Sequence, residues 1–280
     1  MAGKNEKTVG DSRWNGGGGE KAYYLYCLAL PRLVPEGGKG FSGPLLIHRS
    51  DSIAAVVEIV SVDDFRGAAG DANMNDFSWL IPRTLVHEMV VERVMESSPV
   101  VPARFATIFP SIDRLRFFMT LNRKTIMKFF LEIEDKTEWT VKGFLNRELA
   151  RKKEEAGLLE AREPFLSTLS SGRRYFEEKK IISGAHDLVG NRSGSVFRDV
   201  LDSLTHHAVN FCDLTILKGL REKNGRDLFL NRAFLVPESS LARFRDCVRL
   251  ASDHHGAGGF TFELTGPWPP YSFLPPFEYR

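Results

Sequence analysis

The sequence predicts an α+β protein with two domains. Its 280 residues exceed one average domain, which usually has about 100–200 residues. Along the second half, the expected elements follow the order strand, long helical region, strand, strand, helix, strand. This is the order of the ferredoxin-like split βαβ fold. The first half is a variant of the same α+β theme, so we predict a modified ferredoxin-like domain there.

The first 20 residues end in four glycines, Gly16–Gly19, and contain little apolar surface. Such a segment cannot compensate for the entropy lost on ordering, which predicts a disordered tail over 1–20. We therefore expect an N-terminal domain over 21–135 and a C-terminal domain over 136–280. A helix links the two domains.

The N-terminal domain begins with an aromatic strand that Pro31 ends. Two short apolar runs joined by polar residues predict a hairpin. Helical spacing of apolar residues from Leu80 to Met95 predicts a helix that closes at Pro99. An extended segment follows over 100–106. Ser111 is the expected N-cap of one helix that runs to about Glu134. The predicted strands are Tyr23–Leu30, Leu45–His48 and Ile53–Ile59.

The C-terminal domain begins with a predicted strand, Glu138–Asn146. A charged helical region over 148–180 contains Pro164, which predicts a break or kink. Three glycines make 183–194 an expected loop. An apolar stripe from Val196 to Phe211 then predicts another helix. The remaining expected elements are the strands 214–217 and 228–236, a helix from Leu241, and the strand 260–265.

Composition argues against several classes of protein. A net charge of +2, with 38 basic and 36 acidic residues, disfavours a nucleic-acid-binding protein. The three scattered cysteines predict neither a disulfide framework nor a cysteine zinc site. The longest apolar run is far shorter than a membrane helix requires. No secretory signal is recognised, so we expect a cytoplasmic protein without a membrane partner.

Three motifs suggest chemistry but lack essential residues. Gly38–Gly43 matches GxGxxG, but Pro44 and a strand follow it in place of a phosphate-binding helix. His87-Glu88 begins like HExxH, but Val91 occupies the second histidine position. Two histidine doublets, at 206–207 and 254–255, have no recognisable further ligands. We therefore expect no catalytic, cofactor or metal site.

The carboxyl end contains three prolines interleaved with Trp268, Tyr271 and Phe273. Proline favours extended backbone and removes amide donors, so an arm should leave the last strand. The three aromatic side chains either pack on their own domain or form an aromatic surface for a partner. Both roles can hold for different residues.

Several segments spread over residues 23–273 match the pattern of one known family. They are Tyr23–Tyr26, Trp79 with His87, Val101–Phe109, Glu138–Lys142, Asn231–Pro237 and Thr265–Phe273. In these segments the sequence resembles the gas vesicle GvpF/GvpL family. The last two segments are the most specific. Ala106 and Thr140 stand where the family often has glycine. Within these segments, Trp79, His87, Arg104, Glu138, Lys142 and Phe234 are interpreted as structural residues.

The resemblance implies two ferredoxin-related domains, no cofactor and no catalytic activity. It implies an accessory protein of gas vesicle assembly, associated with the vesicle. The expected partners are the small hydrophobic shell protein GvpA, whose aggregation it would limit during nucleation, and other accessory gas vesicle proteins. An enzyme on a ferredoxin-like scaffold is the alternative, because one fold hosts many functions. Its best candidate residues are His87, Arg104 and Glu138.

Overall fold

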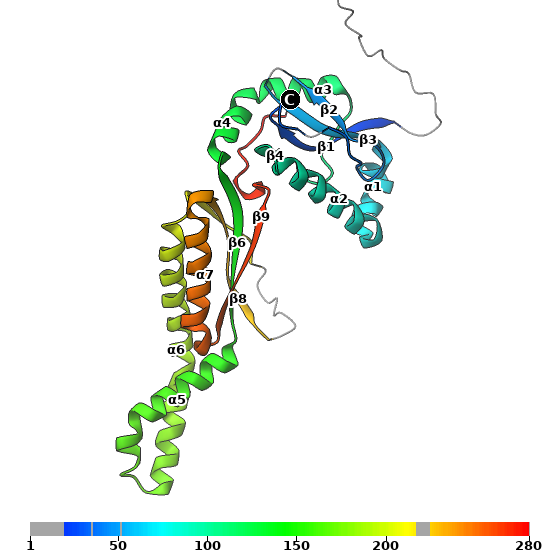
Figure 1. The fold of residues 1–280 in the computed structure, drawn as a ribbon. Coiled ribbons are helices and arrows are strands. Elements are labelled where there is room, and N and C mark those ends of the chain that lie inside the picture. The colour runs from blue at the N-terminus through cyan, green and yellow to red at the C-terminus, as the bar shows by residue number, and fades with distance from the viewer. Residues whose placement is uncertain (1–19, 35, 51, 217–224, 280) are drawn as a thin grey trace, which may run out of the picture.

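The computed structural model describes residues 20–34, 36–50, 52–216 and 225–279. The predicted tail over 1–20 lies outside these ranges except for Glu20. The chain forms two antiparallel sheets with helices packed on them (Figure 1), which confirms the predicted α+β class. Among the described residues, no helix is both long and apolar enough to span a bilayer.

The N-terminal domain contains a five-stranded sheet in the order β2-β3-β1-β4, with β5 also paired to β1. The hairpin prediction is confirmed by β2 and β3, which pair in antiparallel register. The elements are β1 (Lys21–Ala29), β2 (Leu46–Arg49), β3 (Ala54–Ser61), α1 (Gly67–Asn75), α2 (Phe77–Met95), β4 (Val100–Pro102), β5 (Ile108–Phe109), α3 (Ile112–Leu121) and α4 (Arg123–Ile133).

The C-terminal domain contains a four-stranded sheet in the order β7-β8-β6-β9. Counted within each domain, both sheets place their strands in the order second, third, first, fourth. The domains differ in the first connection, which is a loop after β1 and a helical hairpin after β6. The elements are β6 (Lys136–Leu145), α5 (Arg147–Leu166), α6 (Ser171–Thr205), β7 (Asn210–Asp213), β8 (Asp227–Pro237), α7 (Leu241–His255) and β9 (Phe260–Trp268).

Side chains alternate across the strands and so reach different cores. On β1, Tyr24 and Tyr26 enter an aromatic cluster beneath α2, whereas Leu25 and Leu28 face α3 and α4. The N-terminal sheet is therefore covered on both faces. In the C-terminal domain, buried side chains of the sheet pack against α6 and α7.

Two sequence-based predictions for the helices are wrong. The predicted loop over 183–194 lies inside α6, because Val189, Val196 and Val200 bury one face of a continuous helix. That burial outweighs the roughly 1 kcal/mol helix penalty of each glycine. The predicted single helix after Ser111 is divided into α3 and α4 at Asn122. The predicted break near Pro164 is present: Pro164 lies in the last turn of α5, which ends at Leu166, and α6 begins at Ser171.

The predicted strand over 214–217 is also misplaced. The strand is β7, four residues earlier, and it pairs with β8. Phe211 was predicted at the end of a helical stripe but lies in this strand. The polar residues Asn210 and Asp213 at its ends conceal the strand in the sequence.

The glycine-rich loop before β2 encloses the side chain of Glu58. The fully buried Glu58 carboxylate accepts hydrogen bonds from the Tyr26 hydroxyl at 2.6 Å and from the backbone amides of Phe41 and Ser42. A Cβ atom at Gly40 would overlap that carboxylate, whereas one at Gly43 would make ordinary contacts. The GxGxxG match therefore reflects close packing around Glu58.

We predict that Gly40→Ala lowers the free energy of unfolding by about 2–4 kcal/mol, because it displaces a buried carboxylate from its donors. Gly43→Ala is the matched control, and we expect a change below about 1 kcal/mol. Urea unfolding monitored by circular dichroism measures both. Equal stability of the two variants would contradict the assigned loop packing.

Candidate functional site at the junction of the two domains

The C-terminal tail, residues 269–279, leaves β9 and returns to the N-terminal domain, where the chain ends beside α3 (Figure 1). Phe273, Leu274 and Phe277 pack against the core between the N-terminal sheet and α3 and α4. The rings of Phe277 and Tyr279 lie 5.8 and 5.1 Å from that of Phe118. The tail thus completes the core of the first domain.

A backbone clamp fixes the end of the tail. The buried side chain of Asn122, between α3 and α4, donates to the Glu278 carbonyl at 2.9 Å. Its Oδ1 atom accepts from the Glu278 amide at 2.8 Å. A third bond, to the Phe118 carbonyl, satisfies the remaining donor of the amide group. Asn122 therefore both divides the helices and holds the tail.

A second clamp lies where the tail leaves the C-terminal sheet. Glu138 on β6 is only 4% exposed. Its carboxylate accepts from the Ser272 hydroxyl at 2.6 Å and from the Ser272 amide at 3.0 Å. Burial raises the pKa of this carboxyl, and the bonds from Ser272 partly offset that rise. Lys142 lies four residues further along β6 and pairs in register with Glu263 of β9.

The third contact of the tail reaches a buried histidine on α2. His87 Nδ1 lies 2.7 Å from the Tyr24 hydroxyl, and Nε2 lies 3.0 Å from the Ala103 carbonyl oxygen. Because a carbonyl only accepts, Nε2 carries the proton and Nδ1 accepts from Tyr24. The Tyr271 hydroxyl lies 3.1 Å from Nε2 and donates to Glu88 at 3.0 Å. Burial lowers the pKa of His87 to about 4.

Neutral His87 predicts acid sensitivity. Its pKa of about 4 in the folded chain is below about 6.5 for an unfolded histidine. The contribution of neutral His87 to the free energy of unfolding is thus present above pH 6.5 and is lost as the pH falls toward 4. We predict that the free energy of unfolding falls by roughly 3 kcal/mol over this interval. The measurement is urea unfolding of wild type and His87→Gln between pH 7 and 4.

The difference in free energy of unfolding between wild type and His87→Gln separates the effect of His87 from the effects of Glu88 and Glu138. The pKa values of both carboxyl groups are raised, so their protonation stabilises the fold as the pH falls. A wild type–variant difference that is independent of pH would contradict the neutral buried histidine.

We predict that Tyr271→Phe lowers the free energy of unfolding by about 1–2 kcal/mol, because half-buried Glu88 loses a donor. The matched control is Tyr279→Phe, a largely exposed tail tyrosine, for which we expect almost no change. Chemical denaturation gives the stability, and limited proteolysis reports release of the tail. Indistinguishable variants would show that the Tyr271 hydroxyl does not anchor the tail.

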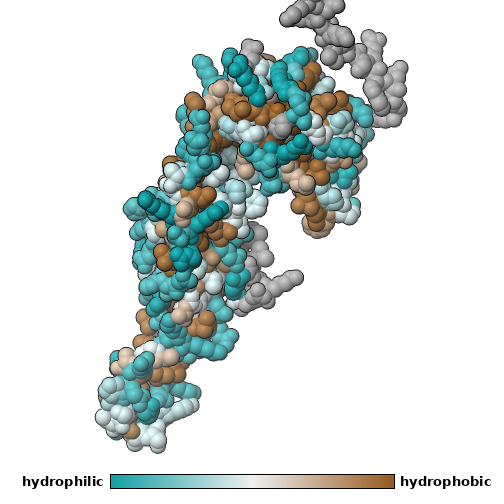
Figure 2. All heavy atoms as spheres, viewed as in Figure 1, coloured by the Kyte–Doolittle hydropathy of each residue, from teal (hydrophilic) through white to brown (hydrophobic). Residues whose placement is uncertain are grey.

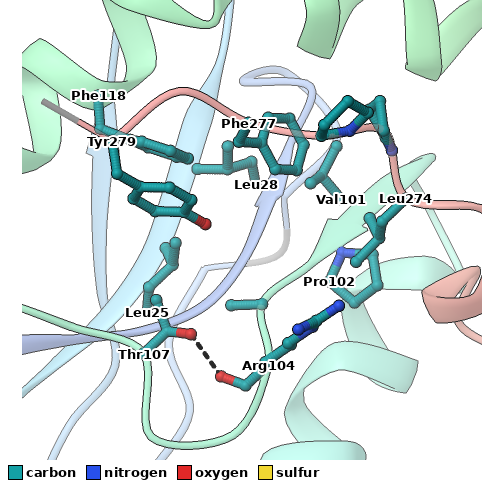
Figure 3. A pocket seen from close by; sticks show the side chains of 13 residues that line it. Leu25, Leu28, Val101, Pro102, Arg104, Thr107, Phe118, Leu274, Phe277 and Tyr279 are labelled. Atoms are coloured by element: carbon teal, nitrogen blue, oxygen red, sulfur yellow. Dashed lines mark hydrogen bonds between the residues drawn. The ribbon is translucent and has the colours of Figure 1, made fainter.

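A groove of about 410 Å³ lies beside the tail (Figure 3). Apolar side chains from β1, β4, α3 and the tail line it, including Leu25, Leu28 and Phe118. The Arg104 side chain borders this groove and is exposed, so it does not need the buried partner that a buried arginine would require. The backbone carbonyl of Arg104 accepts from Thr107.

The three candidate catalytic residues do not share a pocket among those described here. Arg104 borders the groove beside the tail, and Glu138 borders a separate hollow of about 250 Å³ with Trp268 and Pro270. His87 is enclosed by Tyr24, Ala103 and Tyr271. His87 and Glu138 each form hydrogen bonds with other residues of the protein. Within the described ranges, no group of three histidine, cysteine or acidic side chains is arranged to hold a metal ion.

The remaining predicted residues lie in different environments. Trp79 packs against Phe65 and Phe105, with the Arg83 guanidinium 4.2 Å from its ring centre. Phe234 is fully buried in the C-terminal core against Phe244. Of the three aromatic residues predicted to contact a partner, Tyr271 and Phe273 are partly buried on the N-terminal domain, whereas Trp268 at the end of β9 is 39% exposed.

Sequence reasoning did not identify four polar residues that organise the junction and its neighbourhood: Glu58, Glu88, Asn122 and Ser272. Glu58 has a visible sequence signal as the single charge in the apolar run Ile53–Val60, and Glu88 was noticed only as part of the incomplete HExxH match. Ala106, whose φ is +67°, adopts a left-handed conformation that favours glycine. This agrees with the glycine that the resembling family often has there.

Comparison with known proteins covers both domains. Residues 22–275 match the family described as gas vesicle synthesis protein GvpL/GvpF. The chain is 27% identical over 262 residues to gas vesicle protein L of Streptomyces sp. strain CB03234, covering 91% of this chain and 93% of that relative.

The fold is similar to two crystal structures of gas vesicle protein GvpF. For the protein from Anabaena sp. PCC7120, the TM-score is 0.65 at 16% identity, covering 93% of this chain and 98% of that one. For the protein from Microcystis aeruginosa, the TM-score is 0.62 at 17% identity, covering 91% and 99%. With more than 90% of this chain covered, the likeness extends over both sheets.

Proposed function

Because the chain belongs to the GvpL/GvpF family of gas vesicle proteins, we propose that it is a noncatalytic accessory protein of gas vesicle assembly. In this role it binds the hydrophobic shell protein GvpA in the cytoplasm, limits its aggregation during nucleation and associates with the vesicle. The observation that carries the proposal is the family match across residues 22–275. Other accessory gas vesicle proteins are further partners.

The use of the candidate catalytic groups supports a noncatalytic role. Glu138 is occupied by Ser272, and His87 by Tyr24 and the Ala103 carbonyl. Catalytic sites need titratable groups that converge on a substrate pocket. These two groups instead connect the tail and the N-terminal domain.

The proposed contact with the shell protein combines an aromatic side chain with free strand edges. Trp268, at the end of β9, is more exposed than Tyr271 and Phe273, and tryptophan is frequent among residues that dominate binding energy. The outer strands β2, β7 and β9 each pair on one side within the described sheets. An edge strand can accept an extended segment of a partner through backbone hydrogen bonds. Tyr271 and Phe273 support Trp268 by fixing the tail.

We predict that this chain co-elutes with GvpA after co-expression and increases the soluble fraction of that protein. Trp268→Ala should weaken the binding about tenfold, as expected for loss of an aromatic anchor. Phe176→Ala, at an aromatic residue of the distant α5–α6 hairpin that is 73% exposed, is the control and should bind like wild type. A folded, monodisperse chain that neither binds GvpA nor changes its solubility would contradict the proposal.

A further inference from the structure

The outer side of α2 carries a continuous line of large apolar side chains. Phe77, Ile81, Leu85 and Met89 are 73%, 52%, 60% and 65% exposed. A spacing of four residues places side chains on neighbouring turns of one helix face. We call these four residues the apolar ridge. Figure 2 shows hydrophobic atoms gathered at the free end of the N-terminal domain, where Figure 1 places the start of α2.

The apolar ridge is unusual because α2 is also apolar on its inner side. His87, Val90, Val91 and Val94 are buried against the sheet. The exposed positions from 77 to 89 are all uncharged, and they are Phe77, Ser78, Ile81, Pro82, Leu85 and Met89. A surface helix normally presents charged residues to water, and a helix that is apolar all round is normally buried. The ridge thus has the composition of a covered surface.

We propose that the apolar ridge binds the uncharged face of an amphipathic helix from a partner protein. The ridge extends over about 18 Å, the length of slightly more than three helical turns. Rows of side chains spaced four apart pack into the grooves of a facing helix. Because the ridge offers no exposed charge, a charged residue at the centre of the partner face would be buried without compensation. The partner helix therefore carries apolar residues at intervals of three and four.

The chemistry of the surface distinguishes this occupant from two others. Helices that lie on lipid are rich in lysine and arginine on their polar face, whereas the exposed arginine of α2, Arg93, lies in its last turn near Glu96. A second copy of the chain would need about 800 Å² on each partner for a stable dimer. The ridge offers on the order of 400–500 Å², which suits one helix.

The inference rests on the proposed function in taking GvpA as the first partner to test. The variant is Ile81→Glu with Leu85→Glu, which places two carboxylates on the ridge at exposed positions. Leu131→Glu, at an equally exposed leucine on α4, is the matched control. Circular dichroism melting curves of both variants establish that they fold like wild type.

We expect the double variant to bind GvpA at least tenfold more weakly, with the control unchanged. Equal binding by wild type and the double variant would overturn the ridge inference and leave the proposed function intact. If wild type itself does not bind GvpA, the proposed function fails, and a second probe decides the inference. That probe is a designed amphipathic helical peptide with a leucine face, titrated by fluorescence anisotropy.

Binding of the peptide by wild type, lost in the double variant and kept by Leu131→Glu, supports the inference. Absence of peptide binding overturns it.

Two further measurements test the other occupants. The first is sedimentation with vesicles of phosphatidylcholine and phosphatidylglycerol. If wild type sediments with them and the double variant does not, the ridge binds lipid. A wild-type dimer that the double variant dissociates would assign it to a second copy.

Discussion

The structure depends on the return of the C-terminal tail to the first domain. Phe273, Leu274 and Phe277 bury apolar surface that β1, α3 and α4 would otherwise expose to water. The first domain therefore lacks part of its core until the last residues of the chain arrive. A domain usually has a hydrophobic core of its own, whereas the core of this N-terminal unit includes residues of the tail. The two sheets are instead coupled by a shared segment.

The polar groups of the junction make this coupling specific. His87, Asn122 and Glu138 are buried, and each has hydrogen-bond partners far away in the sequence. A buried polar group without a partner costs more than a satisfied one contributes, so each clamp penalises alternative positions of the tail. Apolar packing attracts the tail to the first domain, and the polar clamps determine its register.

The sequence predicted the fold class and most elements because these depend on local patterns. Alternating strands and the Ser111 cap are examples, and the Ser111 hydroxyl does accept from the Arg114 amide. The α6 prediction failed because three local glycines indicated a loop, whereas burial of Val189 and Val196 decided the outcome. In the candidate site, the motif residues His87, Glu138 and Tyr271 were noticed individually. Their connection through Tyr24 and Ser272 spans 63 to 184 residues, which no local pattern reports.

The path of the tail has a consequence for biosynthesis. A ribosome completes the strands of the first domain long before it adds Tyr271 and Phe277, so that domain must wait with an open core during translation. Contacts of such long sequence separation also slow folding. A chain that lacks residues 271–279 would leave the Phe118 region exposed to water and to proteases that degrade incompletely folded chains. Completion of the N-terminal core thus depends on synthesis of the tail.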